Sequence, residues 1–63
     1  MKYSYSFTDS LGTEYEDSGT DLTALAESLS VALTEAGEEG RVKIYDEPGF
    51  TRGWAKAGEW HLS

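Results

Sequence analysis

The chain has 63 residues and no cysteine, and its 12 acidic residues against 5 lysines and arginines give a net charge of −7. This length predicts a single domain, residues 1–63, around one small core, and the composition excludes disulfides and cysteine-based metal sites. No apolar run is long enough for a signal peptide or a membrane span, so we expect a cytoplasmic protein with no membrane partner.

The chain begins with two segments that alternate between apolar and polar residues. Residues 2–8, KYSYSFT, place aromatic side chains on one side and polar side chains on the other, which is typical of a half-buried strand. Residues 9–12, DSLG, have the composition of a turn. Residues 13–17 then predict a second, unusually acidic strand with Tyr15 facing inward.

The only sustained helical pattern lies in the middle of the chain. Residues 21–36, DLTALAESLSVALTEA, repeat apolar residues at spacings of three and four, which predicts an amphipathic helix. Thr20 or Asp21 is expected to cap its first turn, and Gly37 to end it in the left-handed conformation. Ser30 falls on the polar side of this pattern.

Three short strands are expected after the helix. They comprise residues 41–45, 51–55 and 59–62, each with an alternating pattern. Between the first two, residues 46–49, DEPG, predict a turn with Pro48-Gly49 as its central pair.

The last connection allows two registers. A three-residue loop at residues 56–58, with Gly58 left-handed, sets Trp54 opposite Trp60 on the core face. A two-residue turn at residues 57–58 puts the two tryptophans on opposite faces. We favour the three-residue loop, because it alone buries both tryptophans.

These elements predict an α+β fold of order β-β-α-β-β-β, with one α-helix packed on a single antiparallel β-sheet. A helix with one apolar stripe and strands with one apolar face can bury both surfaces only against each other. The expected core residues are Tyr3, Tyr5, Phe7, Leu22, Leu25, Leu29, Leu33, Val42, Ile44, Trp54, Trp60 and Leu62.

No group of residues carries a catalytic pattern. His61 is the only histidine, without a cysteine nucleophile or a second histidine as metal ligand. Adjacent side chains in a strand diverge, so Asp46-Glu47 is a poor cation site. The glycines form no phosphate-binding motif. We therefore expect a protein that is not an enzyme and that uses no metal or cofactor.

The charge is unevenly distributed along the chain. Residues 1–40 hold nine acidic residues against Lys2 alone, a net charge of −8, whereas residues 41–63 have a net charge of +1. Acidic surface keeps a small protein soluble, but this asymmetry also predicts a recognition surface for a basic partner. It opposes direct binding to nucleic acid, whose phosphates repel a net anion.

The whole chain loosely resembles a family in its architecture. A short, acidic, cysteine-free chain with one helix on a small antiparallel sheet looks like the phage-encoded anti-CRISPR proteins. Its closing segment, RVKIYDEPGFTRGWAKAGEW, resembles the tail of some members that act on type I surveillance complexes. The resemblance implies a stoichiometric inhibitor in the cytoplasm of the host cell, and it assigns no role to any numbered residue.

Our leading hypothesis is a small acidic protein that imitates nucleic acid. It would occupy the nucleic-acid-binding surface of a basic nucleic-acid-binding protein or of a CRISPR effector complex. It would do so as a monomer or weak homodimer and would not bind nucleic acid itself. The residues expected to bind the partner are Glu14, Glu16, Asp17, Asp21, Glu38 and Glu39.

Two alternatives remain open. The first is a structural or accessory module that completes an oligomer through its sheet edge or helix. The second is a small regulatory domain that contacts nucleic acid through basic residues of the second half, which are Arg41, Lys43, Arg52 and Lys56.

Overall fold

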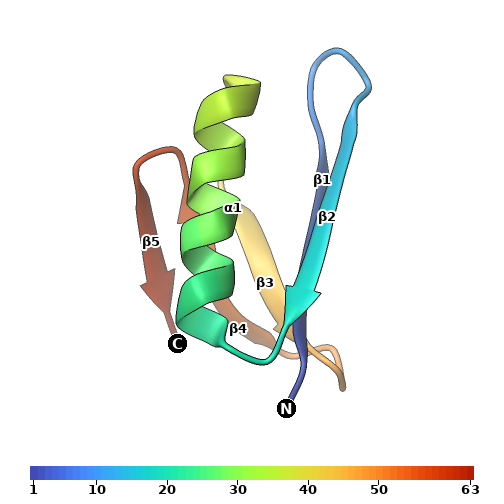
Figure 1. Ribbon diagram of the computed structural model, residues 1–63, viewed down its shortest axis with the longest axis vertical. Coiled ribbons are helices and arrows are strands. Elements are labelled where there is room, and N and C mark those ends of the chain that lie inside the picture. Colours follow the sequence, from blue (N-terminus) through green and yellow to red (C-terminus); the bar gives the residue numbers. More distant parts are fainter.

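The computed structural model describes residues 1–63 and contains one helix and five strands. In chain order these are β1 (Tyr3–Thr8), β2 (Glu14–Gly19), α1 (Leu22–Ala36), β3 (Val42–Asp46), β4 (Thr51–Lys56) and β5 (Glu59–Leu62). The strands form one antiparallel sheet in the order β2-β1-β3-β4-β5, and α1 covers one of its faces (Figure 1). The predicted α+β fold is therefore confirmed. The uncovered side of the sheet is called the open face below. The helix is neither long nor apolar enough to cross a membrane.

The two ends of α1 follow from its flanking residues. Asp21 has extended backbone and its Oδ1 accepts a hydrogen bond from the Ala24 amide (3.2 Å), which supplies an acceptor that the first turn lacks. Gly37 ends the helix with φ of 70°, and its amide donates to Thr34 O. Both predicted boundaries are confirmed, with Asp21 rather than Thr20 as the cap.

The core lies between α1 and the covered face of the sheet. Seven residues form its buried centre: Tyr5, Leu25, Ala26, Leu29, Leu33, Ile44 and Ala55. Tyr3, Phe7, Leu22, Val42 and Trp60 pack around it and are partly buried. Leu62, which was expected in the core, is 39% exposed because it lies on the edge strand β5, one residue from the C-terminus.

The predicted position of Ser30 was wrong, because its side chain is buried instead of lying on the polar side of α1. Its hydroxyl donates to Lys56 O (3.0 Å) and accepts from the Gly58 amide (3.1 Å). Two polar backbone groups of the β4–β5 turn are thus satisfied by the helix. The serine at this position joins α1 to that turn, which an apolar residue would not do.

The loops β1–β2 and β3–β4 share one design built on an aspartate. In the first, Asp9 N donates to Thr13 O, Gly12 N donates to Asp9 O, and Gly12 has φ of 85°. Asp9 Oδ1 also accepts from the amides of Leu11 and Thr13, both at 2.9 Å. Each loop therefore has three residues and ends on a left-handed glycine, as in a hairpin with a bulge.

The second loop repeats this geometry and corrects the predicted turn. Asp46 N donates to Phe50 O and Gly49 N donates to Asp46 O, so the central pair is Glu47-Pro48 and not Pro48-Gly49. Asp46 Oδ1 accepts from the amides of Gly49 and Phe50. Asp46 is buried, and its side chain holds the loop together.

The β4–β5 connection is the two-residue turn, so the favoured register was wrong. Trp54 pairs with His61, and Ala55 pairs with Trp60. Trp60 therefore packs on the core, while Trp54 lies on the open face. Gly58 has φ of 84°, so its predicted left-handed conformation is confirmed although the loop in which it was predicted is not. Small Ala55 rather than Trp54 fills the buried position under α1.

The sheet has a narrow junction at its centre. β1 pairs with β2 over six positions, but with β3 over only two, Tyr3 with Asp46 and Ser4 with Tyr45. Beyond this short pairing β3 leans away from β1 (Figure 1). The two pairs join the first half of the chain to the second.

Candidate partner-binding surface

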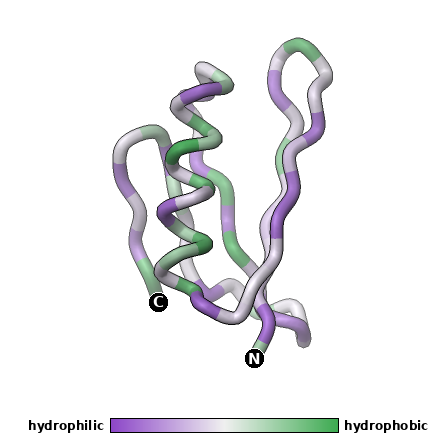
Figure 2. Tube along the Cα trace, viewed as in Figure 1, coloured by the Kyte–Doolittle hydropathy of each residue, from purple (hydrophilic) through white to green (hydrophobic).

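The strand order turns the uneven charge of the sequence into an uneven charge in space. β2 and β1 form one end of the sheet and come from the acidic part of the chain, whereas β3, β4 and β5 form the other end. Figure 2 shows hydrophilic residues along β2, at the free edge of the sheet. The β1–β2 half of the sheet is therefore acidic and the β3–β5 half is weakly basic, while α1 carries further acidic residues over the covered face.

Two of the six predicted residues stand on the open face of β2. Glu14 pairs with Thr8 and Glu16 with Ser6, positions whose side chains point away from α1. Both glutamates are exposed. Residues two apart on one strand lie on the same side at about 6.6–6.8 Å, so these two carboxylates form the start of a row.

The next two predicted residues lie where β2 turns into the helix. Asp17 pairs with Tyr5, on the covered side of the sheet, yet it is exposed because β2 is the edge strand. Its Oδ1 accepts from the Ser18 amide (2.8 Å). Asp21 caps α1 as described, so its carboxylate has a structural task in addition to any binding.

The remaining two predicted residues follow the other end of α1. Glu38 Oε1 accepts from the Ser10 amide (3.0 Å), which ties this end of the helix to the β1–β2 loop. Glu39 is exposed and makes no side-chain hydrogen bond. The structure thus brings Glu38 close to the β1–β2 hairpin, but it does not gather all six residues into one cluster.

Sequence reasoning missed an acidic group around Tyr15. The Tyr15 hydroxyl donates to Asp9 Oδ2 (3.2 Å). Hydrogen bonds from the Thr13 and Leu11 amides, and from this hydroxyl, lower the pKa of Asp9 below its usual 3.8. Partial burial, the hydrogen bond to Asp9 and the charges of Asp9 and two glutamates, Glu35 and Glu38, raise the pKa of the Tyr15 hydroxyl.

None of the six predicted carboxylates forms an ion pair within the chain. The two ion pairs of the molecule join Arg52 to Asp46 (3.4 Å) and Lys56 to Glu59 (3.6 Å), both in the other half. Asp46 and Glu59 are thereby partly neutralised, and the Asp46 carboxylate is fully engaged by amides and Arg52. No group of three or more acidic or histidine side chains is placed to hold a metal ion.

The basic half carries a stack of three side chains on the open face. The Arg41 guanidinium lies 4.0 Å from the centre of the Trp54 ring, and the rings of Trp54 and His61 stack at 4.7 Å. β3 and β5 flank β4 on opposite sides, so Arg41 and His61 approach Trp54 from opposite sides. An aromatic ring enclosed in this way is a poor platform for a nucleic-acid base.

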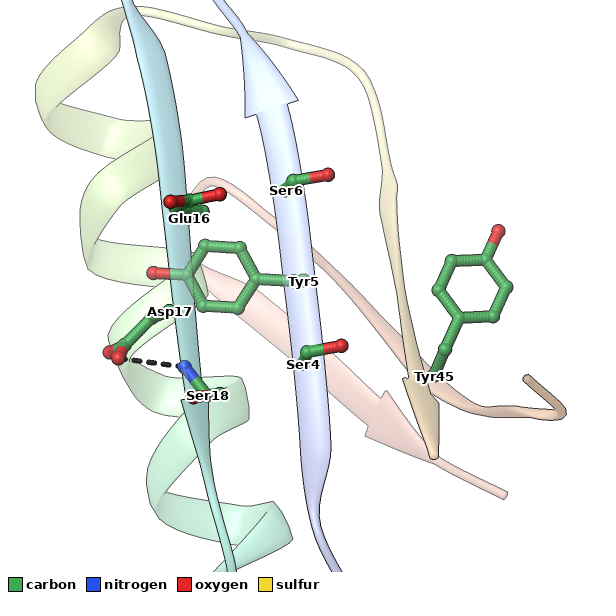
Figure 3. Close-up of a pocket in the computed structure, with 7 residues that line it drawn as sticks. All are labelled: Ser4, Tyr5, Ser6, Glu16, Asp17, Ser18 and Tyr45. Carbon is green, nitrogen blue, oxygen red and sulfur yellow. Dashed lines mark hydrogen bonds between the residues drawn. The ribbon is translucent and has the colours of Figure 1, made fainter. Parts of the chain in front are cut away.

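A shallow depression of about 570 Å³ lies on the open face between the two halves. Figure 3 shows Ser4 and Ser6 of β1 between Glu16 on β2 and Tyr45 on β3. Tyr5, Asp17 and Ser18 complete its lining. The depression exists because β1 presents only small side chains here, between larger ones on the neighbouring strands.

These features define a small α+β protein with an exposed acidic strand at one edge of its sheet. No family model, no curated protein and no solved structure matches the chain.

Proposed function

We propose that this chain is a small acidic binding protein that occupies a basic, nucleic-acid-binding surface of another protein as a stoichiometric inhibitor. The observation that carries the proposal is an acidic edge whose carboxylates have no cation of their own. The chain's two ion pairs lie in the other half of the sheet. Carboxylates without an internal partner leave their field directed at the solvent, where it attracts a basic surface.

The amount of charge supports imitation of nucleic acid. Residues 1–40 carry nine carboxylates, and the molecule is 31 Å long. One strand of duplex DNA carries a phosphate about every 3.4 Å, or about nine over the 31 Å length of this molecule. The carboxylates of residues 1–40 therefore equal in number the phosphates of one strand over this length, although they are distributed over the β1–β2 hairpin, α1 and the loop that follows it. A groove lined with lysine and arginine would attract both.

The resemblance to anti-CRISPR proteins names a target class, a type I CRISPR surveillance complex. The test is a displacement assay in which the protein competes with target DNA for such a complex. The variant replaces Glu14, Glu16 and Asp17 by Gln, Gln and Asn. We expect it to lose displacement while it keeps its fold, because exposed carboxylates contribute little to stability.

The matched control removes the same charge elsewhere. Replacing the exposed Glu27, Glu47 and Glu59 by Gln changes the net charge by the same amount but leaves the β2 edge intact. We expect this control to retain most of the displacement. Circular dichroism of both variants checks the fold.

Salt separates this function from the alternatives. Displacement by an acidic mimic should weaken steeply between about 50 and 500 mM salt, because ions screen exposed charges beyond the Debye length. Displacement by the neutralised triple variant at the wild-type concentration would overturn the proposal. Partner binding that salt leaves unchanged would instead favour an accessory module that joins an oligomer through its sheet edge or helix.

A further inference from the structure

The two halves of the open face carry unpaired charges of opposite sign. On β2, Glu14 and Glu16 point to this face and form no ion pair. On the other half, Lys43 alternates with the buried Ile44, so its side chain lies on the open face, and Arg41 lies on the same face two residues before it. Neither cation takes part in the chain's two ion pairs. One half therefore offers two unpaired carboxylates, and the other offers two unpaired cations.

The same two halves differ in relief. β1 presents Ser4 and Ser6 on the open face, and the shallow depression lies over these small side chains (Figure 3). β3 and β4 present the longer side chains of Lys43, Tyr45 and Trp54. The acidic half is therefore hollow and the basic half is raised, so the open face is complementary to itself in both charge and shape.

We propose that two copies of this chain form a symmetric dimer through their open faces. A two-fold axis that runs along the strands at the β1–β3 junction places β3 and β4 of the second copy over β1 and β2 of the first. Each raised basic half then lies on the hollow acidic half of the other copy. An axis across the strands would instead bring the two acidic halves together.

The strand register sets the opposite charges at the same level along this axis. Ser4 pairs with Tyr45, and because β1 and β3 are antiparallel, Ser6 and Lys43 both lie two residues further in the same direction. Ser6 pairs with Glu16. Glu16 and Lys43 are therefore level with each other on opposite halves of the face.

Rotation about an axis along the strands leaves these levels unchanged. Glu16 of one copy therefore faces Lys43 of the other, and two residues further along the strands Glu14 faces Arg41. β3 leans away from β1 beyond their short pairing, which carries both cations of the second copy toward β2 of the first (Figure 1). Because the dimer is symmetric, it contains each of these charge contacts twice.

The size and net charge of the chain limit the strength of this dimer. The face measures at most 31 by 20 Å, so each copy can bury about 600 Å², at the lower end for specific complexes. Two chains of net charge −7 also repel each other at a distance. We therefore expect a weak dimer that needs enough salt to screen this repulsion.

The dimer goes beyond the proposed function and does not depend on it. Glu14 and Glu16 are covered in the dimer, so the monomer is the form that would bind a basic partner. Self-association and partner binding then exclude each other.

The test is sedimentation equilibrium of the protein alone at about 150 mM salt, where the Debye length is about 8 Å. We expect the average mass to rise from one chain toward two between about 10 µM and 1 mM, as for a small interface. In NMR spectra recorded over the same range, the amide resonances of Ser6, Glu16 and Lys43 should shift with concentration.

Charge reversal identifies the surface. Glu14→Lys with Glu16→Lys, and separately Arg41→Glu with Lys43→Glu, should each weaken self-association about ten-fold or more, because like charges then face each other. An equimolar mixture of these two double variants should restore the dimer, since each half then faces the opposite charge again. All four side chains are exposed, so the fold should persist, and circular dichroism verifies this.

The matched control reverses two charges on the other side of the molecule. Glu27→Lys with Glu35→Lys changes the net charge as much as the Glu14 and Glu16 pair does, but both residues are exposed on α1, away from the open face. We expect this control to dimerise at least as well as the parent protein, because its net charge is smaller.

The outcomes separate the dimer from the proposed function. A protein that stays monomeric at 1 mM would overturn the dimer and leave the proposed function standing, because that function needs only one chain. Self-association that survives both double reversals, or that the α1 control also loses, would overturn this interface. A dimer that behaves as expected in a protein that displaces no nucleic acid would leave the dimer standing and refute the proposed function alone.

Discussion

Replacing Ser30 by Ala sets two effects of opposite sign against each other. Alanine is the better helix former, by about 0.5 kcal/mol, which alone would stabilise α1. The same change removes both hydrogen bonds between Ser30 and the β4–β5 turn, to Lys56 O and from the Gly58 amide. At about 1 kcal/mol each, their loss outweighs the gain. The net expectation is a destabilisation of about 1.5 kcal/mol.

This loss is measurable by two methods. For a domain of this size 1 kcal/mol shifts Tm by about 4–8 °C, so Ser30→Ala should melt about 6–12 °C below the parent protein. Urea denaturation followed by tryptophan fluorescence should show a lower midpoint with an unchanged slope, because the surface exposed on unfolding stays the same.

Ser28→Ala is the matched control. Ser28 lies in the same helix, is only partly exposed, and makes no side-chain hydrogen bond. Helix propensity alone therefore acts there, and we expect Tm to rise by about 2–4 °C. If the Tm of the Ser30→Ala variant also rose, the hydrogen bonds of the hydroxyl to the turn would contribute nothing to stability, and the reasoning would be refuted.

Three further changes test the core, the last hairpin and the first loop. Leu29→Ala should destabilise by about 2–5 kcal/mol, because Leu29 is fully buried, and a Tm within two degrees of the parent would contradict this core. Gly53→Ala should destabilise strongly, since its Cβ would lie 2.7 Å from the backbone oxygen of His61, whereas Gly19→Ala meets nothing within 4 Å and should leave the urea midpoint nearly unchanged. The folded protein lowers the pKa of Asp9, so its contribution to stability is present above about pH 3.8 and is lost as the pH falls further. Asp9→Asn should therefore flatten the dependence of the urea midpoint on pH between about 5 and 2, and an unchanged slope would show that Asp9 is not the group responsible.

Periodicity predicted the elements because it reports burial directly. The alternating aromatic residues of β1 and the apolar stripe of α1 each needed one covered face, and one helix on one sheet is the arrangement that provides it. Ser30 escaped this reasoning, because a hydroxyl can be buried wherever backbone groups offer it a donor and an acceptor. The position of a polar residue near the edge of an apolar stripe does not reveal by itself whether its side chain will be buried or exposed.

The last hairpin was mispredicted because burial of the tryptophans was given too much weight. Trp54 loses contact with water on the open face too, since Arg41 and His61 enclose its ring there. The two-residue turn also gives the Gly58 amide its acceptor on Ser30. Both compensations come from residues far from the turn, so the segment itself could not show which register is more stable.

The acidic edge could be predicted in part from the sequence, but the depression could not. Glu14 and Glu16 were recognisable as outward residues of an acidic strand. That Tyr45 lies beside Ser4, however, depends on β1 being placed between β2 and β3. No local pattern determines that order. The small outward serines of β1 were the one sign that a hollow could form there.

The two-residue pairing of β1 with β3 has a consequence for folding and breathing motions. Hairpins close quickly because their loops are short, while joining β1 to β3 brings together residues about forty positions apart and carries the larger loop entropy. We expect the β1–β2 hairpin and the β3–β4–β5 unit to form separately and then to join at this junction, under α1. In the native state the junction is also where the sheet should part first, so its amides should exchange with deuterium sooner than those between β1 and β2. The open-face depression lies across this line, so a partner that covered the open face of both units would hold them together.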